Sequence, residues 1–341
     1  MKLADVVGHE RAVARLRHAA AGRVPAAILI LGPPGVGKRT LADAFTARLL
    51  CAAPVDGDAC GTCAQCTRVA AGTHPDVRLV ERDEDRRDIR IDQARDLCRW
   101  LGLQPLMTDR KVAIIDGAHY LNEHGQNALL KTLEEPPGNS VLLLLAASAA
   151  LVLPTVRSRC QLVRLDPLPG EAVARVLEAR GVDRERASVL AALAEGSPGR
   201  ALGLDGDEQL RSRALVLERL PELPRLTAAD ISQLAQDMTR GSPDAALAAT
   251  LSWYRDVLQA GLVGDALPLR NPDAAAAVRA AAADLSSADV LRQLEGVCDT
   301  ILALERNANR VLALETMLLW LRDIARGAVA GSARVTWTNV R

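Results

Sequence analysis

Aromatic residues and lysine are both scarce in this sequence. Phe, Tyr and Trp together make up 2% of 341 residues, so the core must be built from Leu, Val, Ile and Ala, and a base-stacking aromatic platform is not expected. A surplus of one charge is also missing, because Lys+Arg and Asp+Glu both total 42. A free-standing nucleic-acid binder usually carries a basic surplus, which this chain lacks. With 49% apolar and 25% charged residues, a disordered chain is excluded.

Long apolar segments are missing as well. The first 20 residues carry charges throughout and contain no apolar stretch of the signal-peptide type. The longest apolar run, Val141 to Pro154, is too short to cross a bilayer and fits a buried strand with its loop. We therefore expect a cytoplasmic protein without a membrane segment, whose seven cysteines bind metal or lie buried as thiols.

Five short apolar runs alternate with helical patterns in the first half of the chain. Most are apolar on both faces, as strands of a parallel sheet covered by helices should be. The runs are Ala26–Leu31, Val77–Val80, Lys111–Asp116, Val141–Ala146 and Gln161–Leu165. Ala- and Leu-rich helical patterns follow to near residue 328. The sequence predicts a doubly wound α/β domain over 1–165, a small helical domain over 166–205, an all-α domain over 206–330 and a tail at 331–341.

A glycine-rich loop follows the first of these strands and precedes a helical pattern. It consists of Gly32, Pro33, Pro34, Gly35, Val36, Gly37, Lys38, Arg39 and Thr40. Backbone N–H groups and the start of a helix hold phosphate oxygens in such loops, and Lys38 reaches the outer phosphates. A Ser or Thr that ligates Mg²⁺ normally follows the lysine, whereas here Arg39 follows it and the threonine comes one place later. We predict a nucleotide site whose metal-dependent hydrolysis is impaired.

The strand Lys111–Asp116 ends in an aspartate of the kind that helps to hold the metal in P-loop ATPases. The next position is normally a glutamate that polarises the attacking water, and here it is Gly117, which can do no proton chemistry. Two positions needed for hydrolysis thus lack the required side chain. Together they favour a site that has lost hydrolysis.

Four cysteines follow directly after the helix that begins at the phosphate loop. Cys51, Cys60, Cys63 and Cys66 have the spacing C-x8-C-x2-C-x2-C, and the residues between them are mostly small or polar. Four thiolates this close can surround one tetrahedral Zn²⁺, which we expect here as a structural ion. An iron–sulfur cluster and free thiols are the alternatives. No cysteine follows Cys66 at the bacterial ferredoxin spacing, so the iron–sulfur cluster is the lesser of them.

The remaining thiols and imidazoles indicate no further catalytic centre. Small buried apolar roles are expected for Cys98, Cys160 and Cys298. The histidines show no zinc-enzyme spacing, and the sequence suggests no Ser/His/Asp set. Surface or capping roles are expected for His9, His18, His74, His119 and His124.

Taken in order, these motifs resemble the clamp-loader AAA+ family of bacterial DNA polymerase III, and within it the delta-prime branch. A four-cysteine insert directly after the phosphate-loop helix is rare in other AAA+ families. The segments NALLKTLEEPP (127–137) and SRC (158–160) are highly specific for clamp loaders. The segments VGHE (7–10), GSPGRAL (196–202) and NANRVLALE (307–315) resemble the family's N-terminal box, second-sensor segment and collar helix.

The resemblance implies roles for single residues. Arg159 would be an arginine finger that enters the ATP site of an adjacent gamma/tau subunit. Arg200, in the small helical lid, and Asp116 would join the phosphate loop in binding ATP or ADP. Delta-prime members are expected to lack hydrolysis, which agrees with Arg39 and Gly117. The isolated chain is therefore expected to have neither polymerase nor ATPase activity.

The resemblance also implies partners. The protein would join the gamma/tau and delta subunits in a hetero-oligomer, reach the sliding clamp through that complex, and contact primer–template DNA without base specificity. The all-α domain would form the oligomerising collar, with Trp253 and Trp320 either at subunit contacts or in the domain core. A hydrolysing gamma/tau-type ATPase and a stand-alone P-loop kinase or signalling ATPase are the alternatives, and the second gives no reason for the SRC segment or the cysteine insert.

Overall fold

The computed structural model describes residues 2–83, 88–267, 269–305 and 308–328. The chain divides into two compact units, Met1–Ala201 and Leu202–Arg341, and each is described by itself. The predicted tail at 331–341 lies outside the described residues. The predicted division into three domains stays a prediction.

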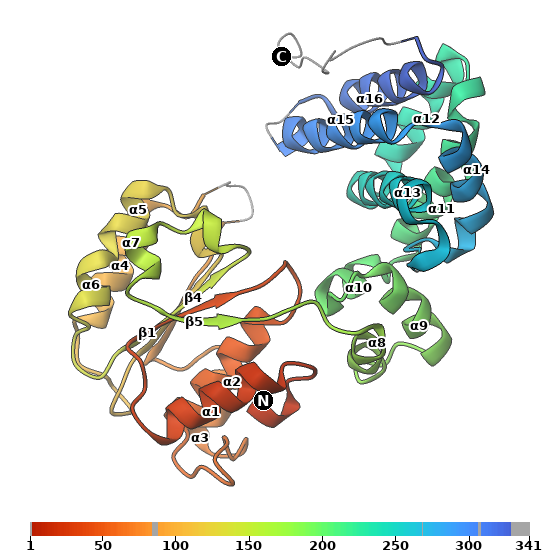
Figure 1. Ribbon diagram of the computed structural model, residues 1–341. Helices are drawn as coiled ribbons and strands as arrows, with labels where there is room; N and C mark the ends of the chain where they lie inside the picture. Colours follow the sequence, from red (N-terminus) through yellow and green to blue (C-terminus); the bar gives the residue numbers. More distant parts are fainter. Residues whose placement is uncertain (1, 84–87, 268, 306–307, 329–341) are drawn as a thin grey trace. The chain divides into compact units, whose positions relative to one another are not determined.

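The first unit is built on a five-stranded parallel sheet with the strand order β2-β3-β4-β1-β5 (Figure 1). The strands are β1 (Ala27–Leu31), β2 (Val77–Val80), β3 (Val112–Asp116), β4 (Val141–Ala146) and β5 (Gln161–Arg164). Each begins and ends within one residue of the range expected from the apolar runs. Every residue of β1 and β4 is buried, because helices cover both faces of the sheet. The predicted parallel sheet is confirmed.

Two helical layers cover this sheet, and alternate strand residues point into them (Figure 1). Ile28 and Ile30 enter the core on one face, whereas Leu29 and Leu31 enter the core on the other. The first layer holds α1 (Glu10–Ala21), α2 (Lys38–Leu50) and α3 (Ala64–Ala70). The second layer holds α4 (Ile91–Leu101), α5 (Glu123–Ala128), α6 (Leu130–Glu134) and α7 (Pro154–Arg157).

Three short helices follow the last strand. The segment between β5 and the first of them contains Pro167 and Pro169, which end the strand pattern. The helices are α8 (Gly170–Glu178), α9 (Arg184–Leu193) and α10 (Pro198–Leu204). α8 and α9 pack against each other, and the turn that starts α10 contacts the glycine-rich loop within the first unit.

The second unit consists of helices in its described residues. The α-helices are α11 (Asp207–Arg219), α12 (Ala228–Arg240), α13 (Pro243–Val263), α14 (Ala275–Asp284), α15 (Ser287–Glu305) and α16 (Arg310–Ala325). Trp253 is buried in their shared core, and Trp320 packs against that core. The core alternative is therefore confirmed for Trp253. Cys298 is exposed on α15, so the prediction of a buried thiol was wrong there.

Short 3₁₀ segments complete the secondary structure of both units. They are η1 (Leu3–Asp5), η2 (Ala118–Tyr120), η3 (Ala149–Leu151), η4 (Leu220–Arg225), η5 (Gly264–Ala266) and η6 (Pro272–Ala274). Among the described helices, none combines the length and the apolar character needed to cross a bilayer.

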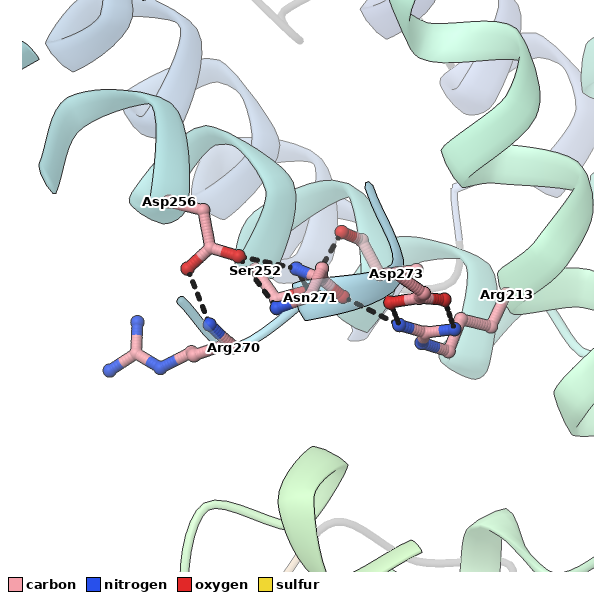
Figure 2. A network of polar contacts seen from close by, with 7 residues as sticks. Arg213, Ser252, Asp256, Arg270, Asn271 and Asp273 are labelled. Carbon is pink, nitrogen blue, oxygen red and sulfur yellow. Dashed lines mark hydrogen bonds and ion pairs between the residues drawn. The ribbon is translucent and has the colours of Figure 1, made fainter. Parts of the chain in front are cut away.

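A buried polar network joins α13 to the segment before α14 (Figure 2). Asp256 is fully buried and accepts hydrogen bonds from the backbone N–H groups of Arg270 and Asn271 at 3.0 and 2.8 Å. The side-chain amide of Asn271 donates a further bond to Asp256 at 2.9 Å and accepts one from Arg213 at 3.0 Å. The Arg213 guanidinium also binds both oxygens of Asp273 at 2.8 Å. Because its lone pairs are satisfied, the Asp256 carboxylate holds the connection against α13.

Candidate nucleotide site and cysteine cluster

The glycine-rich loop runs from the end of β1 to the start of α2 at Lys38. Gly35 and Gly37 have φ angles of +73° and +109°, in the region that side chains rarely adopt. A Cβ atom on Gly35 would also lie 2.4 Å from Ser197 Oγ. Glycine is therefore required at position 35 by the backbone and by the segment packed on it. A turn of this kind before a helix gives the loop the local form of an anion-binding nest.

Lys38 lies against its own loop. Its Nζ donates hydrogen bonds to the carbonyl oxygens of Gly32 and Pro33, at 2.7 and 2.8 Å. Burial lowers the pKa of the Lys38 ammonium, and the Asp116 carboxylate opposes this shift. The lysine and the strand-end aspartate therefore belong to one electrostatic site, as the sequence predicted.

The segment predicted as a second sensor packs directly on this loop. Ser197 Oγ donates a hydrogen bond to the Pro34 carbonyl at 2.9 Å, and the Gly199 N–H donates to the Gly35 carbonyl at 2.9 Å. A Cβ atom on Gly199 would lie 2.7 Å from Gly35 Cα. The two backbones touch because both residues are glycine, and this contact holds the start of α10 on the loop.

Two side chains at the loop differ in their contacts from what the sequence indicated. Arg200 NH1 donates to Glu195 Oε2 at 2.6 Å, so its guanidinium is paired within the segment that follows α9. His9 is buried, and its Nε2 lies 2.9 Å from the Val36 carbonyl oxygen. The surface or capping role expected for His9 was therefore wrong, because this imidazole supports the phosphate loop.

Arg39 is surrounded by carboxylates. Its Nε donates to both carboxylate oxygens of Asp43 at 2.9 Å. Its NH1 lies 3.6 Å from Asp116 Oδ2 and 3.7 Å from Glu81 Oε2. Burial raises the pKa of Asp43, whereas the hydrogen bonds and charge of Arg39 oppose the shift. A guanidinium thus faces the aspartate that holds Mg²⁺ in P-loop ATPases.

The residue after β3 is constrained to be glycine. Gly117 has a φ of +82°, and a Cβ atom there would lie 2.5 Å from Cδ2 and 2.9 Å from Cε2 of Tyr120. A glutamate at this position would meet both backbone strain and the aromatic ring. Thr40 is exposed in the first turn of α2, one place beyond the position of a metal-binding hydroxyl. The residues present therefore do not fit the Mg²⁺ ion of a hydrolysing P-loop site.

Arg159 lies just after α7 and is exposed over about a third of its side chain, at 35%. Its Nε donates to Glu134 Oε1 at 2.7 Å, and its NH1 donates to the Thr155 carbonyl at 2.9 Å. Glu134 ends α6, so the NALLKTLEEPP segment holds the arginine of the SRC segment. In the described part of the chain, no hydrogen bond or ion pair joins Arg159 to the phosphate loop, as a residue acting on another subunit requires.

The four predicted cysteine ligands come together. Their sulfur atoms all lie within 4.8 Å of one another, and Cys60 Sγ is 3.9 Å from Cys66 Sγ. Four sulfurs around one zinc at about 2.3 Å would be about 3.8 Å apart. Cys51 follows α2 directly, Cys63 is the N-cap of α3, and Cys66 lies within α3. The cluster can therefore hold one metal ion.

Backbone N–H groups stabilise thiolates in this cluster. The N–H groups of Cys60 and Cys63 point at Cys51 Sγ and Cys60 Sγ, at 3.2 and 3.3 Å. Hydrogen bonds from the backbone N–H groups of Thr62 and Cys63 lower the pKa of Cys60 to about 6. Burial raises the pKa of Cys66 to about 12. A metal ion would offset the cost of ionising the buried thiol, because thiolates bind metal.

Several residues of the site were missed in the sequence. Asp43 stands four residues after Arg39 on one helix, and this spacing could have identified the pair. Glu81 follows β2, and only the adjacency of β2 and β3 places it near Asp116. Ser197 and Tyr120 carry no sequence signal for their contacts with the loop and with Gly117.

The fold and the site together define a P-loop α/β domain with a four-cysteine insert after the loop helix. The family described as "DNA polymerase III, delta subunit" matches residues 8–169. Over this N-terminal part, the chain belongs to the delta-prime family of DNA polymerase III subunits.

Named relatives agree with this family. DNA polymerase III subunit delta′ of Pseudomonas aeruginosa is 42% identical over 200 residues, which are 58% of this chain and 61% of that protein. Subunit delta′ of Escherichia coli is 35% identical over 202 residues, which are 59% and 60% of the two chains. Subunit tau of Escherichia coli is 36% identical over 227 residues, 62% of this chain and 34% of tau. The chain thus spans about three fifths of the length of these delta′ relatives.

Among solved structures, a protein of Thermotoga maritima related to the gamma subunit of DNA polymerase III is similar to this chain. It has 18% sequence identity and a TM-score of 0.42, over 92% of this chain and 99% of that one.

Proposed function

We propose that this protein is the delta-prime-type subunit of a bacterial clamp loader. In this function it assembles with gamma/tau and delta subunits and helps to place the sliding clamp on primed DNA in the cytoplasm. The observation that carries the proposal is the pairing of a well-formed phosphate loop with the Arg39–Asp116 ion pair and Gly117. A subunit of this design keeps the architecture of the ATPase without its hydrolytic chemistry.

Assembly is the first test. The purified full chain is mixed with the gamma/tau, delta and clamp proteins of the same organism and separated by size-exclusion chromatography. We expect this chain to elute with gamma/tau and delta in one complex. Elution as a separate species at micromolar concentrations would contradict the proposal. The zero net charge agrees with a subunit that supplies part of a shared DNA groove, so binding of primed DNA is expected for the complex and not for the isolated chain.

ATP hydrolysis separates this proposal from the alternative of a gamma/tau-type ATPase. The isolated chain is expected to release no phosphate above buffer level, because neither a hydroxyl follows Lys38 nor a carboxylate follows Asp116. Lys38→Ala is the control, since it removes the phosphate-binding ammonium. Metal-dependent turnover that disappears in this variant would favour the hydrolysing alternative.

Arg159 is proposed as an arginine finger for the neighbouring ATPase subunit. Its ion pair with Glu134 and its bond to the Thr155 carbonyl leave a third of the side chain exposed in an ordered position. A guanidinium placed so can spread charge from the γ-phosphoryl group of a nucleotide bound by another subunit. Replacement by lysine keeps the charge and loses the fork, so Arg159→Lys separates charge from geometry.

Structural zinc is proposed for the cysteine cluster, and ATP or ADP for the phosphate loop with Arg200 nearby. The sulfur spacing and the N–H groups aimed at the sulfurs support a tetrahedral thiolate site. Elemental analysis of the purified chain is expected to find one zinc per molecule. Iron with acid-labile sulfide would favour the iron–sulfur alternative, and the absence of any metal would favour free thiols.

A further inference from the structure

Arg39 supplies the positive charge at the place where a P-loop ATPase has its metal. Three carboxylates lie around it, from Asp43, Glu81 and Asp116. Lys38 is the other cation in contact with this group through its interaction with Asp116. The guanidinium therefore offsets charge that an ATPase site offsets with Mg²⁺.

The same guanidinium has donors to spare. Of its five N–H groups, only the one on Nε makes hydrogen bonds in the described part of the chain, and both of these go to Asp43. The side chain is 37% exposed, so its outer nitrogens are reachable from solvent. A guanidinium fork matches the oxygens of a phosphate group, and charge-assisted bonds of this kind are strong.

We propose that the phosphate loop binds the phosphates of a nucleoside di- or triphosphate without a divalent cation, with the Arg39 guanidinium in the place of the metal. The inference rests on nucleotide binding at the loop, which is part of the proposed function. It adds that binding is independent of Mg²⁺ and names the residue responsible.

The carboxylates around Arg39 give the proposal a sharp converse. Removal of the guanidinium leaves Asp43, Glu81 and Asp116 close together, and carboxylate oxygens are the ligands that Mg²⁺ prefers. Arg39→Thr would also supply the hydroxyl that normally follows the lysine. This single substitution is therefore expected to convert a metal-independent site into a metal-dependent one.

Calorimetric titration of the full chain with ADP and with ATP tests the proposal, each in EDTA and in Mg²⁺. The wild-type dissociation constant is expected to differ by less than about twofold between the two conditions, whereas Mg²⁺ should tighten binding to Arg39→Thr at least about tenfold. Arg39→Lys keeps a cation and should stay independent of Mg²⁺, and Lys38→Ala should lose binding. Far-UV circular dichroism and thermal melting establish that each variant is folded.

The outcomes are distinct. Wild-type binding that needs Mg²⁺, or the absence of ADP and ATP binding in both conditions, would overturn the proposal. An Arg39→Thr variant whose affinity ignores Mg²⁺ would overturn the role given to Arg39. Because assembly with gamma/tau and delta is measured without nucleotide analogues, failure here leaves the proposed function standing, and failure of assembly leaves this result interpretable.

Discussion

Replacing Gly117 by glutamate restores the carboxylate that P-loop ATPases use to polarise water, yet we predict that it damages the protein instead of activating it. The φ of +82° costs a non-glycine residue about 1–2 kcal/mol. The added Cβ would lie 2.5 Å from Cδ2 of Tyr120, and overpacking of this kind costs about 1–3 kcal/mol. Together the two effects lower the free energy of unfolding by about 2–5 kcal/mol.

Urea denaturation of Gly117→Glu and Gly117→Ala measures this loss. Both variants carry the strain and the overlap, so the alanine variant separates them from any effect of the carboxylate. Tyr120→Ala removes the ring, and the double variant with Gly117→Ala should recover about 0.5–3 kcal/mol relative to the sum of the single changes. Phosphate release by Gly117→Glu should stay at buffer level. A Gly117→Glu protein as stable as the wild type, or one that hydrolyses ATP, would refute the reasoning.

Three further predictions concern parts of the chain outside this loop. Cys63→Ser should lose the bound metal and lower the melting temperature, as measured by elemental analysis and calorimetry, whereas Cys298→Ser, at an exposed thiol, should change neither. Asp256→Ala should cost about 1–3 kcal/mol in urea denaturation, because buried N–H donors lose their acceptor. Burial raises the pKa of Asp76, but hydrogen bonds from the N–H groups of residues 106–108 outweigh it and hold the pKa below its usual range. The stability that Asp76 adds over Asn should therefore be complete near neutral pH and shrink as the pH falls below about 5.

The sheet and the four cysteine ligands could be predicted because their signals are local. Strands β1 and β4 are continuous apolar runs, and the cysteines lie within one short stretch. The impaired hydrolysis could also be read from two positions, Arg39 and Gly117.

The contacts that give these positions their character could not be read in the same way. Glu81 approaches Arg39 because β2 and β3 are neighbours in the sheet, which the sequence does not state. Ser197 reaches the Pro34 carbonyl across more than 160 residues of sequence, at 163 positions. His9 was assigned to the surface because a single imidazole near a helix start has no distinguishing pattern, whereas the packing of α1 buries it beside Val36. Long-range proximity, and not residue type, is what the sequence left out.

ATP turnover by the assembled clamp loader in the presence of clamp and primed DNA tests the central claim most directly. The complex is prepared with the wild-type chain, with Arg159→Ala and with Arg159→Lys, and assembly is verified by chromatography. We predict that both variants assemble and keep their metal, that turnover falls because one ATP site of a neighbouring subunit loses its guanidinium, and that the isolated chain hydrolyses nothing. Unchanged turnover in the Arg159→Ala complex, or hydrolysis by the isolated chain, would contradict the account.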